Sequence, residues 1–483
     1  MKKNKITTIV LAMAVCLMMG ACGSSESSSS NTSAGSAAAA EGTWETYTPE
    51  TSSSETVTET TTVSSKAAEE QTEDTAEQSD DDVQAVSAST SGEKLNITNE
   101  VVTEYTYYTS GQVDTSDLFS NRDLTQTPDV SEAVYYTVSD NETVTIDTAG
   151  VYVFSGSASN FQIKVEADGE NDKVQIVLNG VTVTNESTPV IYVASADKCF
   201  VTTIEGTVND LSVTGTFTAD GDTTPDAVIF SKDDLVLNGL GTLNISSSNG
   251  NGISGHDDLK ITGGTYTVSS ALDAIEANDS IRICGGTFNI QTNKDGLHCE
   301  NDEGDGWIYI CAGTFSINAA SDGIQATTVL QIDGGEMNIT ASEGLEATYI
   351  QINNGTIEIT ASDDGINAST KSSYSTPTIE FNGGYTTINM GQGDTDGVDA
   401  NGSVYVNGGT VSVNTSGNSF DYDAAAEFNG GTIIINGSEV SEIPQDMMGG
   451  GMGGPMGGGG MGGQGDMGNM GGMGGMGGRG MRA

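Results

Sequence analysis

The feature that most constrains this fold is a short repeat, written eight times between about residues 249 and 437. Each copy reads approximately D-G-I-x-A, then alternates apolar and polar residues before ending in N-G-G-T. The second glycine of that ending recurs about every 22 residues, with occasional insertions, at Gly264, Gly286, Gly313, Gly335, Gly355, Gly384, Gly409 and Gly431. A repeat of this length without helical periodicity is typical of a solenoid of stacked strands. We therefore predict an all-β fold, a parallel β-helix.

The alternation of apolar and polar residues within each copy predicts which positions lie in strands and which lie at corners. In the segments 259–262, 330–333 and 404–407 the apolar residues lie two apart, so they point to one side, toward the core. The next residue falls at a corner, where the column reads Asn238, Thr262, Cys284, Cys311, Asp333, Asn353, Asn382, Asn407 and Asn429. Stacked asparagines predict a ladder of side-chain hydrogen bonds at the strand spacing of ~4.8 Å. The glycines that follow allow the left-handed backbone of a sharp corner.

The other half of each copy predicts two polar columns on one face of the helix. The first column is Asn251, Asp273, Asp295, Asp322, Glu343, Asp364, Asp396 and Asn418, and the second is Ser254, Glu276, His298, Gln325, Glu346, Asn367, Asp399 and Asp421. Each member of the second column lies between two inward residues, so it points outward. Like charges ~5 Å apart repel unless they are screened, protonated or bridged by cations.

Calcium is the cofactor that this pattern favours, because it accepts several carboxylate and carbonyl oxygens in flexible geometry. The insertion at residues 300–305 adds carboxylates beside Asp295, and residues 394–399 present alternate oxygens as calcium loops do. The candidate metal ligands are Asp273, Glu276, Asp295, Asp322, Glu343, Glu346, Asp363, Asp364, Asp394, Asp396, Asp399, Asp421 and Asp423.

The two ends of the chain differ in composition from its middle. Three lysines precede the apolar run 6–19, which is typical of a secretory signal, and residues 19–22 resemble a bacterial lipobox with methionine in place of the usual leucine. Diacylated Cys22 would anchor the protein to the outer face of a membrane; the alternative is an ordinary signal peptide in which Cys22 is incidental. We expect a signal peptide over residues 1–22, a disordered Ser/Thr/Glu-rich linker over 23–94 and a low-complexity Gly/Met tail over 441–483.

Between these ends we expect a lead-in and N-terminal cap over residues 95–139 and the β-helix over residues 140–440. The net charge of −51 excludes nucleic acid as a partner, and we expect a monomer. Cys284 and Cys311 fall at equivalent corners one turn apart, so a disulfide and a stack of free thiols both remain open.

Three stretches resemble a known family: A-G-V-Y-V-F-S-G (149–156), D-K-V-Q-I-V-L-N-G-V-T-V-T-N (172–185) and P-V-I-Y-V-A-S-A-D-K (189–198). With the D-G-I-x-A copies that follow, they are similar to bacterial, mostly clostridial, surface lipoproteins with carbohydrate-binding domains. The likeness covers roughly residues 95–440. It implies a right-handed parallel β-helix similar to that of polysaccharide lyases, and binding of calcium and of acidic plant polysaccharide such as polygalacturonate. It supplies no individual ligand residues.

Three interpretations of the carboxylates remain open at this point. Calcium could be purely structural, it could also bridge to a uronate polymer, or the carboxylates could simply be solvated and cap turns. A polysaccharide lyase would need a basic residue that gives up its proton, and only Lys294 lies on the acidic face, where flanking carboxylates hold its proton more tightly. A passive adhesin or stalk is a further alternative.

The bridging interpretation favours an acidic polysaccharide as the partner, because a shared cation joins two anionic surfaces. The candidate ligand contacts are Lys294 and His298 on the acidic face, with Tyr309 and Tyr405 as outward aromatic residues that could stack on sugar rings. The scarcity of other aromatic platforms disfavours a neutral polymer such as cellulose.

Overall fold

The computed structural model describes residues 44–47, 94–95, 97, 100–301, 304–392 and 395–444. Cys22, the signal sequence, Asp394 and almost all of the predicted tail lie outside the described residues. Within the described part of the chain, no helix is long and apolar enough to cross a membrane.

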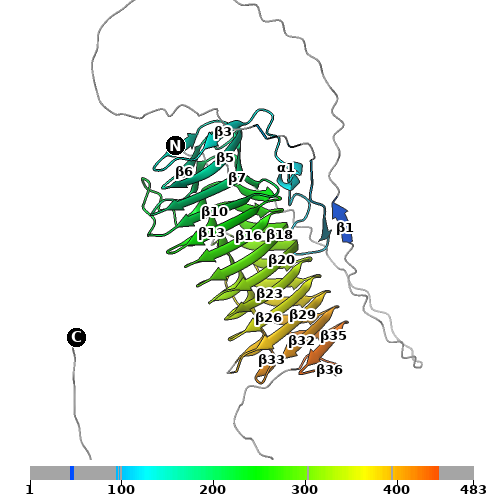
Figure 1. Cartoon of the computed structure of the whole chain (residues 1–483). Coiled ribbons are helices and arrows are strands. Elements are labelled where there is room, and N and C mark those ends of the chain that lie inside the picture. Colours follow the sequence, from blue (N-terminus) through cyan, green and yellow to red (C-terminus); the bar gives the residue numbers. More distant parts are fainter. Residues whose placement is uncertain are drawn as a thin grey trace, which may run out of the picture. The chain divides into compact units, whose positions relative to one another are not determined.

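The described chain winds into a parallel β-helix of about twelve coils, which confirms the predicted fold (Figure 1). One wall is a 12-stranded parallel sheet. It contains β4 (Thr143–Ile146), β6 (Gln162–Glu166), β8 (Ile191–Ser195), β11 (Ala227–Ser231), β14 (Asn251–Gly255), β17 (Ile275–Ala277), β19 (Leu297–Cys299), β21 (Asp322–Ala326), β24 (Glu343–Ala347), β27 (Ile366–Ala368), β30 (Asp396–Ala400) and β33 (Asn418–Tyr422).

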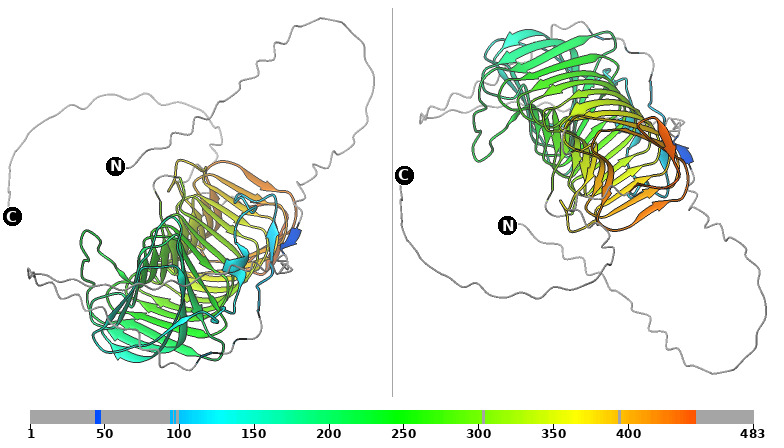
Figure 2. Two further views of the ribbon diagram at one scale, coloured as in Figure 1. Left: turned by 90° about the horizontal axis from the view of Figure 1, so that it is seen from above. Right: turned by 90° about the horizontal axis from the view of Figure 1, so that it is seen from below.

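A 22-stranded sheet forms the rest of each coil, as two rows of strands that meet at a corner. The flank row contains β3 (Val134–Thr137), β9 (Lys198–Thr203), β12 (Leu235–Gly239), β15 (Asp258–Ile261), β22 (Val329–Ile332), β25 (Tyr349–Ile352), β28 (Thr378–Phe381), β31 (Ser403–Val406) and β34 (Ala426–Phe428). The third row contains β10 (Val208–Val213), β13 (Thr242–Ser247), β16 (Thr265–Ser270), β23 (Glu336–Ala341), β26 (Thr356–Ala361), β29 (Tyr385–Met390), β32 (Thr410–Asn414), β35 (Thr432–Ile435) and the antiparallel β36 (Ser438–Val440). The long strands β5 (Gly150–Ser159), β7 (Lys173–Asn185), β18 (Ser280–Thr292) and β20 (Trp307–Asn318) run through both rows. Figure 2 shows these strands wound around a common axis.

The core fills the inside of the coils with columns of like residues. Ile253, Ile275 and Leu297 pair in register from one coil to the next and are fully buried. In the third row the aromatic rings of Tyr266 and Phe288 stack at 5.2 Å between centroids. Because the strand period is two, the predicted inward positions fix the register of each coil.

The predicted amide ladder runs along the later corners. Asn353 donates to Oδ1 of Asp333 at 2.7 Å, and Asn382 donates to Oδ1 of Asn353 at 2.8 Å. Asn407 and Asn429 continue the ladder at 2.8 and 2.9 Å. The four cysteines of the described chain, including those at 284 and 311, are buried free thiols, so the disulfide alternative is not formed.

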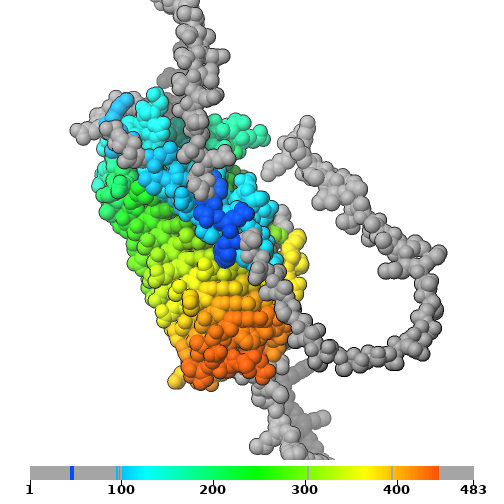
Figure 3. Space-filling view, turned by 90° about the vertical axis from the view of Figure 1, so that its right-hand side faces the viewer, coloured from blue at the N-terminus to red at the C-terminus, as the bar shows by residue number. Residues whose placement is uncertain are grey.

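The lead-in segment lies along the side of the helix, where Figure 3 shows it as a cyan strip. It contains β2 (Tyr105–Tyr108) and the short α1 (Asn121–Leu124). Thr103 Oγ1 donates to the carbonyl of Thr262 at 2.9 Å, and the backbone N–H of Val113 donates to Oε1 of Gln331 at 2.8 Å. The segment predicted as a cap thus covers the flank row. In addition, β3 pairs in parallel with β5, so the first coil begins before residue 140.

One part of the predicted linker is ordered, which corrects the prediction that residues 23–94 are disordered throughout. β1 (Trp44–Tyr47) pairs antiparallel with β2, placing Trp44 opposite Tyr108 and Tyr47 opposite Tyr105. Its two aromatic side chains supply apolar area that the rest of the linker lacks.

Candidate functional site

The two polar columns lie on the outer side of the 12-stranded sheet in the predicted register. Ser254, Glu276, His298, Gln325 and Glu346 pair successively along the second column, and the pairing continues through Asn367, Asp399 and Asp421. We call this surface the acidic face. Its side chains are more buried than the sequence predicts, because neighbouring coils are only one strand spacing apart.

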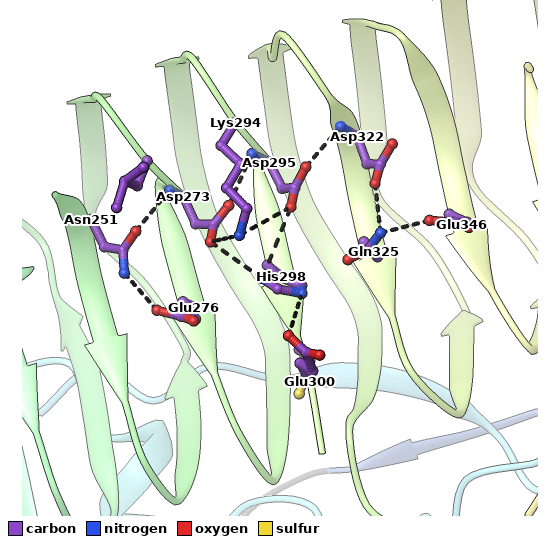
Figure 4. Close-up of polar contacts among 12 residues, drawn as sticks. Asn251, Asp273, Glu276, Lys294, Asp295, His298, Glu300, Asp322, Gln325 and Glu346 are labelled. Carbon is purple, nitrogen blue, oxygen red and sulfur yellow. Dashed lines mark hydrogen bonds and ion pairs between the residues drawn. The ribbon is translucent and has the colours of Figure 1, made fainter. Parts of the chain in front are cut away.

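The first column also has a structural role. Asp273 Oδ1 accepts the backbone N–H of Asp295 at 3.0 Å, and Asp295 Oδ1 accepts that of Asp322 at 2.9 Å, as Figure 4 shows. Asp364 Oδ1 accepts the N–H of Asp396 at 3.1 Å in the same way. One oxygen of each of these aspartates therefore holds the next coil in place, and only the other oxygen is available for further chemistry.

At the N-terminal end of the acidic face, Asp273 is paired with basic side chains of the protein itself (Figure 4). Lys294 Nζ lies 2.7 Å from Oδ2 of Asp273, and His298 Nδ1 lies 3.2 Å from the same oxygen. Burial alone would lower the pKa values of both bases, but their hydrogen bonds to Asp273 reverse the effect, and both pKa values are raised. Asp273, Glu276 and His298 converge within 4.8 Å, but Asp273 is already paired with Lys294 and His298.

The middle of the acidic face holds a second cluster, Asp322, Glu343 and Glu346. Gln325 Nε2 donates to Asp322 and to Glu346, each at 2.6 Å, and Lys371 Nζ lies 2.7 Å from Glu346. Burial, with the nearby Asp295 and Glu343 charges, raises the pKa of Asp322 to about 8. A single lysine therefore balances only part of this cluster.

The C-terminal cluster consists of Asp396, Asp399 and Asp421, whose ligand atoms converge within 4.8 Å. Among the ion pairs of the described residues, none involves Asp399 or Asp421. Burial, together with the nearby charges of Asp364, Asp396 and Asp421, raises the pKa of Asp399 to about 7. All three side chains are half-buried, so an ion can reach them from solvent.

The remaining predicted ligands lie at the edge of these clusters. Asp363 and Asp423 are exposed, next to Asp364 and Asp421 respectively. Neither is part of a convergent group of the described residues.

Two of the predicted sugar contacts, His298 and Tyr309, are buried and therefore out of reach of a polysaccharide. His298 is only 4% exposed, so it cannot lie against a polymer. Tyr309 is fully buried under the lead-in segment, where its hydroxyl donates to Oδ2 of Asp333 at 2.9 Å. Lys294 keeps an exposed side chain but is ion-paired, and Tyr405 is half-buried.

The chain also matches known proteins. A family model described as carbohydrate-binding domain-containing protein matches residues 140–395 and 342–441, which together span most of the β-helix. The chain belongs to this family. A carbohydrate-binding domain-containing protein of Acetivibrio thermocellus is 38% identical over 135 residues, which are 28% of this chain. The match spans 46% of that relative, less than half its length.

A solved structure is also similar, that of the polysaccharide lyase-like protein from C. thermocellum in its gadolinium derivative. The sequence identity is 29% and the TM-score is 0.42, over 44% of this chain and 92% of that chain.

In the present protein, the oxygen atoms of the C-terminal cluster suit a hard divalent cation. The cluster offers only carboxylate oxygens, which calcium prefers, and two of its three carboxylates, Asp399 and Asp421, form no ion pair among the described residues. The N-terminal cluster fits calcium poorly, because Lys294 and His298 already neutralise Asp273.

We expect the metal-free protein to lose stability as the pH rises from about 4 to about 8. The pKa values of Asp322, Glu343, Asp364 and Asp399 are raised to about 8, 7, 6 and 7, with burial as the largest cause of each. In this window the folded protein holds protons that the unfolded chain releases, so rising pH favours unfolding. Thermal melts in chelator should give a lower Tm at pH 8 than at pH 5.

Calcium supplies the control for this pH effect. An ion that binds the ionised carboxylates of the folded state raises Tm, and the increase should be larger at pH 8 than at pH 5. Equal melting temperatures at both pH values in chelator would contradict the prediction.

Proposed function

We propose that this protein binds calcium at the C-terminal cluster of the acidic face and, through that calcium, an acidic polysaccharide. The observation that carries the proposal is the convergence of Asp396, Asp399 and Asp421 without a cationic partner for Asp399 or Asp421. Membership of a carbohydrate-binding family supports a glycan as the ligand.

The proposed chemistry follows from charge. A protein of net charge −51 repels a polymer of uronates, so direct contact between carboxylates is unfavourable. In the proposal, Asp396, Asp399 and Asp421 hold calcium, which supplies positive charge and accepts further oxygen ligands from the polymer. Asp364 orients Asp396 by accepting its backbone N–H, and thereby positions the cluster.

The proposal places the protein on the outer face of a bacterial membrane, anchored as a monomer through Cys22. The lipobox-like residues 19–22 and the preceding apolar run support this placement. The chain between the anchor and the β-helix is long enough to hold the acidic face away from the membrane.

Retention on immobilised polygalacturonate tests the proposal. The protein should be retained in millimolar calcium and released by chelator, and neutral polymers should not reproduce this calcium dependence. Calorimetry of the same protein with calcium alone should show binding. If calcium binds but polygalacturonate is not retained, the calcium is structural, as in a passive stalk, and the bridging proposal fails.

Neither of the lysines that the described chain places on the acidic face, Lys294 and Lys371, favours a lyase instead. Lys294 lies between Asp273 and Asp295, and its raised pKa keeps the ammonium group protonated at neutral pH, so it is not available as a general base. Lys371 is paired with Glu346 at 2.7 Å, and Arg282 is paired with Asp258 at 2.7 Å. We therefore expect no unsaturated product when polygalacturonate is incubated with the protein and calcium.

A further inference from the structure

A hollow of about 570 Å³ lies away from the acidic face, where the β1–β2 ribbon meets the loop that follows β2. Its lining includes the aromatic side chains of Tyr47, Tyr105 and Tyr107, and polar side chains from Gln112, Asp114 and Thr115. The volume is within the range of small-molecule sites. Neither the acidic columns nor the sequence repeat contributes a residue to this lining.

The aromatic rings of the hollow are held in fixed positions. Tyr47 and Tyr105 stack with centroids 5.2 Å apart and an interplanar angle of 19°. Tyr105 is packed edge-on against Phe119, and the hydroxyl of Tyr107 donates to Glu45 at 3.0 Å. Tyr105 is buried, whereas Tyr47 and Tyr107 keep part of their surface in solvent. A ligand in the hollow can therefore reach two aromatic side chains, Tyr47 and Tyr107, beside the exposed polar side chains of Gln112 and Asp114.

The loop opposite the rings is anchored to the β-helix beneath it. The N–H of Gln112 donates to Oε1 of Gln351 at 3.1 Å, and that of Val113 donates to Oε1 of Gln331 at 2.8 Å. The N–H of Ser116 donates to Asp114 at 3.0 Å. A site held in this way loses little conformational entropy when a ligand binds.

We propose that this hollow binds a neutral hexose unit of a glycan, independently of calcium. A pyranose ring has apolar C–H faces and a rim of hydroxyls; the faces suit the electron-rich faces of tyrosine rings, and the rim suits amide, hydroxyl and carboxylate groups. The lining contains no lysine, arginine or histidine, so a uronate would find no counter-ion, and Asp114 would repel it.

This second site rests on the proposed function only in taking a carbohydrate as the ligand. The hollow lies over the flank row, where β2 is fixed to Asp333 by a hydrogen bond of 2.7 Å from the N–H of Tyr108. The acidic face belongs to the other sheet. The two sites therefore recognise different sugars on different walls of the helix.

Calorimetry in chelator tests the second site, with cellohexaose, mannohexaose and galactohexaose as neutral probes. At least one probe should bind the full-length protein. Tyr47→Ala should weaken that binding about tenfold or more, because truncating an aromatic contact in a pocket removes much of the affinity. Tyr47→Phe keeps the ring and should bind nearly as the native protein does.

Two further variants keep the test decisive if Tyr47→Ala loosens the ribbon. Trp44→Ala is the matched control, because Trp44 is on the opposite face of β1 and contacts Tyr108 instead of lining the hollow. It should bind the probe normally. Thr115→Trp should block the hollow from the loop side and abolish binding.

The proposal is overturned if none of the three probes binds in chelator, or if Tyr47→Ala and Thr115→Trp bind as tightly as the native protein. Calcium-dependent retention on polygalacturonate should be unchanged in Tyr47→Ala. Failure of that retention in the native protein refutes the calcium proposal alone.

Discussion

The double variant Asp399→Asn with Asp421→Asn is expected to bind calcium about 100-fold more weakly than the native protein. These two carboxylates converge with Asp396 and have no cationic partner among the ion pairs of the described chain. Removing two of three charges from an all-oxygen site removes most of its attraction for a divalent ion. Calorimetric titration with calcium measures the loss, and retention on polygalacturonate should fall with it.

The matched control is Glu336→Gln with Glu358→Gln. Both glutamates are exposed on the third row, away from the acidic face, and the change in net charge is the same. Calcium affinity in this control should remain within about twofold of the native value, because distant exposed charges are screened by salt. Equal losses in the two variants would show that calcium responds only to total charge, and would refute the C-terminal cluster as its site.

The variant Asp123→Ala is expected to lower the free energy of unfolding by about 3–5 kcal/mol. Asp123 is fully buried, and its carboxylate lies 3.5 Å from Lys198 Nζ and 3.6 Å from Lys260 Nζ. It also accepts the N–H of Ser120 at 2.9 Å, which begins α1. Without it, two partly buried ammonium groups lose a counter-ion where α1 is fixed to the flank row. Denaturant unfolding measures the change.

Asp129→Ala is the control for this prediction. Asp129 is an exposed aspartate of the same lead-in segment and accepts the N–H of Ser131 at 3.0 Å. Its loss should cost no more than about 1 kcal/mol, as is usual for a surface turn. If Asp123→Ala is no more destabilising than Asp129→Ala, the buried ion pairs do not hold the segment in place.

The predictions that succeeded concern positions set by local periodicity. The second polar column, from Ser254 to Asp421, pairs in the predicted register, because one wrong step would turn each core residue outward. The asparagine ladder from Asn353 to Asn429 formed because corners one coil apart must stack. Both follow from the repeat itself.

The predictions that failed concern the lead-in segment and β1, which lie over the flank row of the β-helix. Tyr309 is outward, as its alternation requires, yet it is buried because β2 and the following residues lie over it. Nothing in the repeat indicates this cover, because its contacts join distant parts of the chain: Val113 and Gln331, which share one of the hydrogen bonds, are 218 residues apart. Tyr47 was missed for the same reason, since it comes from a stretch with almost no apolar residues. One aromatic residue nearby in the sequence, Trp44, was the one available signal.

Sequence alone determined the coil, its inward residues and the two polar columns, because period-two alternation and corner glycines act within one turn of the chain. Tertiary structure decided how the charges in those columns are balanced. Lys294 and His298 pair with Asp273, whereas Asp399 and Asp421 lie close together and form no ion pair with the side chains that the structure describes. That difference depends on which side chains the stacking of coils brings together and on how deeply each of them is buried. Neither can be read from the residues of a single coil.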